Sequence, residues 1–138
     1  MERKTLVDPA TTLEAGKVLQ AACHNAAWNS GWWHDPKTGI PLLNDVLLRP
    51  YLVGTKLALI HSEVSEGLEG DRKGLMDDKL PHRTMLEVEL ADAVIRIFDL
   101  AGALSLDVGG AIAEKLEFNA QRADHKVEHR AAAGGKAY

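Results

Sequence analysis

The chain has 138 residues, of which 46% are hydrophobic, and its 16 basic and 20 acidic side chains give a formal net charge of -4. A chain of this length can bury one core, so we expect a single domain over residues 1–138. The negative balance provides no positive field to attract nucleic acid, and no run approaches the roughly 18 apolar residues of a membrane-spanning helix.

The lone cysteine, Cys23, cannot form an internal disulfide. The first residues, which are mostly polar or charged, lead into no apolar secretion segment. We therefore expect a soluble protein of the reducing cytoplasm, with neither a membrane nor a nucleic acid as its partner.

Two helices are predicted in the first half of the chain. The first spans about residues 11–30, because Thr11 and Glu14 have the spacing of a capping box and Gly31 ends the run. The second spans about residues 50–69, since Pro50 suits a first turn and apolar residues recur at helical spacing up to Gly70.

Two further helices follow. Thr84 and Glu87 repeat the capping-box spacing, which predicts a third helix from Thr84 to about residue 104, and Asp107 is the expected cap of a fourth over about 107–126. Residues 127–138 have a double glycine and no apolar stripe, which indicates a flexible basic tail. The predicted class is all-α, a four-helix bundle.

All three tryptophans lie close together, at the end of the first predicted helix and in the loop that follows. An aromatic wall suits the stacking of a nucleobase, although tryptophan also commonly fills cores. Trp32 and Trp33 are therefore candidates to stack on a base, and the nearby Asn25 is a candidate to read its edge.

Acidic side chains occur in pairs on the second and third predicted helices. Glu63 and Glu66 are three residues apart, and Glu89 and Asp92 repeat that spacing. On facing helices these four carboxylates would repel one another unless a cation lay between them. An all-oxygen set favours Mg²⁺, with Mn²⁺ as a possible substitute, over zinc. In the alternative, structural interpretation the acids form a solvated face, or Arg96 forms a salt bridge with one of the acids on its own helix, the third.

The fourth predicted helix carries a row of hydrogen-bond donors. Lys115, Asn119 and Arg122 fall at i, i+4 and i+7, and Lys126 continues the row. Such a row suits phosphate oxygens. A solvent-exposed flank paired with neighbouring glutamates is the alternative.

Residues 57–66 and 87–96 resemble the two metal-binding signatures of the MazG-like nucleotide pyrophosphohydrolases, Glu-Glu-x-x-Glu and then Glu-x-x-Asp on the next helix. The two acidic pairs match this pattern, but Ser62 replaces its first glutamate, which leaves open whether one metal ion or two are bound. The donor row is similar to the family's phosphate-contacting residues, and the Gly31-Trp-Trp segment is similar to its small members.

The resemblance implies a Mg²⁺-dependent hydrolase that converts a nucleoside triphosphate, ordinary or modified, into its monophosphate and pyrophosphate. Water would attack the α-phosphorus, oriented or deprotonated by Glu63 or Glu66, with Glu63 favoured. A homodimer or homotetramer is expected. Two alternatives remain: a non-catalytic helical oligomerisation or binding module, and a phosphoribosyl-ATP pyrophosphohydrolase.

Overall fold

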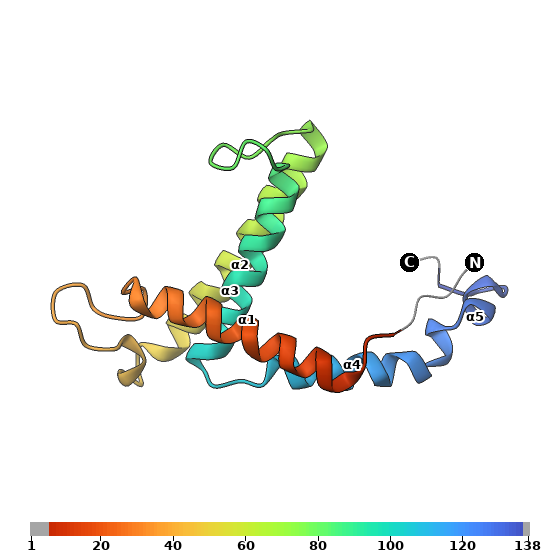
Figure 1. Ribbon diagram of the computed structural model, residues 1–138, viewed down its shortest axis with the longest axis horizontal. Helices are drawn as coiled ribbons and strands as arrows, with labels where there is room; N and C mark the ends of the chain where they lie inside the picture. The colour runs from red at the N-terminus through yellow and green to blue at the C-terminus, as the bar shows by residue number, and fades with distance from the viewer. Residues whose placement is uncertain (1–5, 137–138) are drawn as a thin grey trace. The chain divides into compact units, whose positions relative to one another are not determined.

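The computed structural model describes residues 6–136, and regular structure in this part of the chain is helical throughout (Figure 1). The elements in chain order are α1 (Pro9–Asn29), η1 (Leu42–Asn44), α2 (Arg49–Lys73), α3 (Met85–Ala103), α4 (Val108–Gln121), η2 (Ala123–His125) and α5 (Val127–Ala131), where η denotes a 3-10 helix. The all-α prediction is confirmed, and residues 6–136 contain five α-helices where four were expected. None of the described helices is long and apolar enough to cross a membrane.

The chain divides into two compact units. One consists of Leu19–Leu106, and the other combines Met1–Val18 with Asp107–Tyr138. The single domain predicted from the chain length stays a prediction.

In the Leu19–Leu106 unit, α2 and α3 lie side by side (Figure 1). Two glycines on α2 let the helices approach closely. A Cβ atom added at Gly67 would lie 3.4 Å from Cβ of Glu89, and one added at Gly70 would lie 2.8 Å from Cβ of Met85. Glu89 is therefore held against α2 one turn away from Glu63.

The ends of α2 and α3 follow from local hydrogen bonding. Thr84 caps α3 as predicted, since its hydroxyl oxygen accepts a hydrogen bond from the Glu87 N–H at 3.2 Å. The predicted end of the second helix at residue 69 is wrong, because α2 continues to Lys73. Gly70 serves the contact with α3 instead, and Gly74, at a φ of 61°, adopts the left-handed conformation that ends the helix.

The start of α1 also differs from the prediction. Asp8 caps the helix, accepting hydrogen bonds from the N–H groups of Ala10 at 3.0 Å and Thr11 at 3.1 Å. Pro9, whose fixed φ suits a first turn, begins the helix. The cap expected at Thr11 is therefore wrong.

Asp99 on α3 forms the polar centre of the Leu19–Leu106 unit. It is 6% exposed and accepts hydrogen bonds from Nε1 of Trp33 at 2.7 Å and, through the same oxygen, from Nδ1 of His24 at 3.0 Å. Nζ of Lys56 lies 3.5 Å from its other oxygen. A buried carboxylate is tolerated when it is paired in this way. Through these contacts Asp99 connects α3 to His24 on α1, to Trp33 in the loop after α1 and to Lys56 on α2.

In the other unit, α1 and α4 pack at a contact between glycines, where a Cβ on Gly16 would lie 2.4 Å from Cα of Gly109. Asp107 caps α4 as predicted, accepting a hydrogen bond from the Gly110 N–H at 2.9 Å. The expected extension of this helix to residue 126 is wrong: Arg122 adopts an extended conformation, with φ -68° and ψ 134°, and ends it. Helix α5 lies within the segment predicted as a flexible tail.

Candidate metal centre

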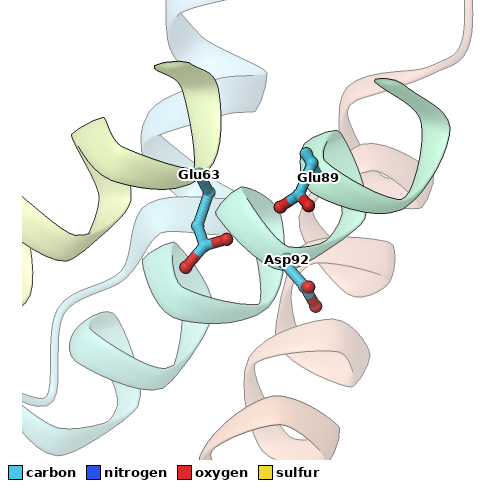
Figure 2. A group of neighbouring side chains, drawn as sticks. All are labelled: Glu63, Glu89 and Asp92. Carbon is cyan, nitrogen blue, oxygen red and sulfur yellow. The ribbon is translucent and has the colours of Figure 1, made fainter. Parts of the chain in front are cut away.

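Three acidic side chains meet between α2 and α3. Glu63 extends from α2 towards Glu89 and Asp92 on α3 (Figure 2). One carboxylate oxygen from each lies within 4.8 Å of the others. Glu63 is 6% and Glu89 8% exposed, while Asp92 is the most accessible of the three. The structure therefore brings together three of the four acids predicted to bind metal.

The concentration of negative charge changes the protonation of Glu89. Burial raises its pKa to about 7, with further contributions from a hydrogen bond to Glu63 and from the charges of Glu66, Glu63 and Asp92. The neutral form is favoured because one more negative charge among these neighbours is costly. A bound cation would reverse this preference, since it stabilises the ionised carboxylates.

Arg96 supplies part of the missing positive charge. Its Nε donates a hydrogen bond to Oε1 of Glu63 at 2.5 Å, and its side chain is 39% exposed. The structural interpretation expected Arg96 to pair with an acid on its own helix, whereas Arg96 pairs with Glu63 on α2. One guanidinium does not balance three carboxylates, and within residues 6–136 neither Glu89 nor Asp92 forms an ion pair of its own.

The donor set fits a hard divalent cation. Mg²⁺ prefers oxygen ligands and usually takes only one or two protein carboxylates, with waters or substrate phosphates completing its shell. The three carboxylates offer at least that number of oxygen ligands, and the accessibility of Asp92 leaves room for waters or phosphate oxygens.

Glu66 lies outside the three-acid group but close to it. It is exposed, and with Glu89 and Asp92 it lines a cavity of about 570 Å³. The connection between α2 and α3 forms the rest of the wall, including Lys79 and the buried Asp77. Asp77 accepts hydrogen bonds from the N–H groups of Lys79 and Leu80, which shape this connection.

A second cavity, of about 400 Å³, also borders Asp92. Its wall combines small apolar residues with Trp32, Lys56, Arg96 and Asp99. Cys23 lines it as well, and burial, with a smaller contribution from Asp99, raises the pKa of the Cys23 thiol. The acidic cluster therefore has access to two cavities that share Asp92.

The residues predicted to bind a base lie in different environments. Trp32 is 71% exposed and lines the 400 Å³ cavity. Trp33 is 1% exposed and packs in the core, so its ring faces are covered in this structure. Asn25 is exposed on α1 and is not among the described residues that line this cavity.

The predicted donor row belongs to the other unit. Lys115 and Asn119 lie on α4; Nζ of Lys115 is 4.7 Å from the Phe118 ring centroid, and Oδ1 of Asn119 is buried without a hydrogen-bond partner among the described residues. Arg122 and Lys126 lie beyond the end of α4, so the row is not a continuous helical strip. Their role towards phosphate stays a prediction.

Arg122 already has a carboxylate partner. Its Nε and Nη2 donate to the two oxygens of Asp124 at 2.9 and 2.6 Å, and Nζ of Lys136 lies 3.2 Å from Oδ2. These cations hold the pKa of Asp124 well below its usual range. A phosphate bound by Arg122 would have to compete with this ion pair.

Sequence reasoning assigned no role in the site to Lys56 or Asp99. Each lies seven residues from a predicted metal ligand, Lys56 before Glu63 and Asp99 after Asp92. Two turns of helix place such residues on the same face. That spacing is the signal that could have identified them.

No family model, curated protein or solved structure matches the chain.

Proposed function

We propose that the chain is a Mg²⁺-dependent nucleoside triphosphate pyrophosphohydrolase that releases a nucleoside monophosphate and pyrophosphate. The observation that carries the proposal is the convergence of the buried Glu63 and Glu89 with the more accessible Asp92 from two helices, with only Glu63 paired to a cation among the described residues. A cluster of this kind favours a cation, and phosphate oxygens are the usual additional ligands of a protein-bound Mg²⁺.

The two cavities that border Asp92 support the proposed pyrophosphohydrolase activity. Asp92 borders both the 400 Å³ and the 570 Å³ cavity. A nucleotide whose α-phosphate lay at Asp92 would have room for its nucleoside in one cavity and for its two remaining phosphates in the other. Lys79, which lines the larger cavity, provides positive charge for those phosphates.

The chain's own groups have distinct roles in this reaction. Glu63, Glu89 and Asp92 would hold Mg²⁺, which when bound neutralises charge on the phosphates and positions the leaving group. The expectation from the sequence was that Glu63 activates the water. Oε1 of Glu63 is committed to Arg96, whereas Glu66 is exposed beside the larger cavity. We therefore assign to Glu66 the orientation and deprotonation of the attacking water.

Pyrophosphate release from a panel of ribo- and deoxynucleoside triphosphates tests the proposal, with Mg²⁺, with Mn²⁺ and with a chelator. We expect metal-dependent formation of the matching monophosphate, abolished in Glu89→Gln and retained in Glu69→Gln. Glu69 is the matched control because it lies on α2 with its side chain 45% exposed and paired to Lys73. Release that persists with chelator, or is lost equally in both variants, would contradict the metal-centre assignment.

The principal alternative is a non-catalytic helical binding module. Six of the large apolar side chains on α2 and α3 are at least 42% exposed, which favours a second copy of the chain as a partner in either case: Leu57, Val64, Leu68, Leu90, Val94 and Ile95. We propose a homodimer or homotetramer in the cytoplasm. Light scattering measures the copy number. A folded oligomer that hydrolyses no nucleotide in the panel, to which phosphoribosyl-ATP is added, would favour the binding module.

A further inference from the structure

Lys56 and Asp99 form an ion pair in the wall of the 400 Å³ cavity. This volume falls in the range of about 300–1,000 Å³ that is typical of small-molecule sites. Apolar walls with a few placed polar groups are also typical of such sites. Here Leu59 and Ile95 provide apolar surface beside the ion pair.

The position of the pair along α3 matches the length of a nucleoside. Asp92 and Asp99 are seven residues apart on one face of α3, and both line the cavity. Seven residues of α-helix span about 10 Å. A nucleotide with its α-phosphate at Asp92 therefore brings the far edge of its base to the Lys56–Asp99 pair.

The ammonium group of Lys56 contacts an acid and an aromatic ring. Nζ lies 3.5 Å from Oδ2 of Asp99 and 4.2 Å from the Trp33 ring centroid, and the side chain is 17% exposed. An ammonium has three N–H donors and no acceptor. Asp99 and the Trp33 ring contact the ammonium without using all three donors, so Lys56 can donate to a ligand in the cavity.

We propose that this cavity binds the nucleobase and that Lys56 selects a base with a carbonyl oxygen at this edge, which among purines means guanine over adenine. This inference rests on the proposed function. Lysine pairs with O6 and N7 of guanine, whereas adenine is read by side-chain amides. Adenine would also present its N6 amino group, another donor, to the ammonium. No asparagine or glutamine is among the described residues that line the cavity.

Trp32 completes the site. Its ring borders the same cavity and is 71% exposed, so it is available to stack on the base face. Stacking alone does not distinguish the bases, because each has a π face. Selection therefore depends on Lys56, which Asp99 positions.

Four deoxynucleotides test the selection on the unaltered protein. We expect kcat/KM for dGTP and dITP, which both carry the O6 oxygen, to exceed that for dATP and the 2,6-diaminopurine nucleotide by about tenfold or more. Inosine lacks the 2-amino group and diaminopurine has it, so the comparison isolates O6. Equal values across the four, or values that follow the 2-amino group, would overturn the proposal.

Lys56→Met separates recognition from structure. The selectivity ratio should fall towards one in this variant and stay unchanged in Lys73→Met, an exposed lysine on the same helix. A merely structural role for Lys56 would lower turnover of all four nucleotides equally, with the ratio intact, which contradicts the proposal. If Lys56→Met does not fold by circular dichroism, the ratio measured on the unaltered protein decides.

Binding of monophosphates distinguishes this inference from the proposed function. Quenching of tryptophan fluorescence by GMP, IMP and AMP without metal measures binding of the monophosphate, independently of metal binding and hydrolysis. Tighter binding of GMP and IMP than of AMP would support base selection even if no triphosphate were hydrolysed. Hydrolysis of the panel with equal binding of the three monophosphates would leave the enzyme assignment in place and overturn the selection by Lys56.

Discussion

Carboxylates between α2 and α3 and carboxylates after α4 have opposite charge environments. Of the three acids Glu63, Glu89 and Asp92, only Glu63 pairs with a cation, Arg96, in the part of the chain that the structure describes, whereas Asp124 alone contacts both Arg122 and Lys136. Accordingly, the pKa of Glu89 is raised and that of Asp124 is lowered. The charge of a carboxylate that contacts two cationic side chains is already compensated. A carboxylate without such a neighbour favours the binding of an additional cation. The presence of acids alone would not have separated the two regions.

The largest expected difference is in the rate of pyrophosphate release when one acid is replaced in each region. Asp92→Asn should reduce metal-dependent pyrophosphate release by about 100-fold or more, because it removes a ligand shared by both cavities. Asp124→Asn should reduce release by less than about tenfold, since Asp124 lies outside the three-acid group. Steady-state kinetics measures both. Equal losses in the two variants would show that the contrast in charge environment does not identify the site.

An intermediate effect is expected at the glycine contact that sets the spacing of α2 and α3. A Cβ at Gly70 would lie 2.8 Å from Cβ of Met85, so Gly70→Ala should destabilise the fold by ~1–3 kcal/mol. Gly54→Ala, on the same helix with nothing within 4 Å, should instead stabilise by up to about 1 kcal/mol. Urea unfolding measures both changes. A stabilising Gly70→Ala would mean that the helices are less closely packed at this position.

The smallest effect concerns pH. The folded-state pKa of Glu89 is raised from 4.5 to about 7, so its stabilising contribution is complete below pH 4.5 and is lost as the pH rises through 7. The lowered pKa of Asp124 has the opposite sign: its contribution is present above pH 3.8 and is lost only at lower pH. Between pH 5 and 8, the contribution of Glu89 to the free energy of unfolding should change and that of Asp124 should not.

Thermal melting of the metal-free protein from pH 5 to 8 measures this difference. Tm should fall across the interval in the unaltered protein and in Asp124→Asn, and the fall should be smaller in Glu89→Gln. Added Mg²⁺ should raise Tm more at pH 8 than at pH 5, because protons compete with the cation for Glu89. A Mg²⁺ effect that is independent of pH would place the cation away from Glu89.

The parts of the fold that sequence predicted well depend on short-range periodicity. The spacing within each acidic pair and the caps at Thr84 and Asp107 are local features, and local geometry determines them. Sequence alone did not show which glycine ends α2. In the sequence, Gly70 and Gly74 are equally good candidates to end the helix. Only the contact of Gly70 with Met85 on α3 distinguishes them.

The details of the site that sequence missed require the tertiary arrangement. Trp32 and Trp33 are adjacent, yet one is 71% and the other 1% exposed, because the loop turns the second ring towards Asp99. The pairing of Lys56 with Asp99 likewise joins residues on different helices. Arg122 was predicted to contact phosphate or, in the alternative, to pair with neighbouring glutamates, whereas its pairing with Asp124 depends on the end of α4.

The position of Cys23 gives this chain a built-in chemical reporter. Cys23 is the only cysteine and lines the cavity that contains Trp32 and Lys56. Because its thiol pKa is raised, the reactive thiolate forms mainly at alkaline pH. Alkylation with a maleimide would then label a single position, and a ligand seated in the cavity would slow that labelling. Cavity occupancy can thus be followed by mass spectrometry on the unaltered protein, with no engineered probe.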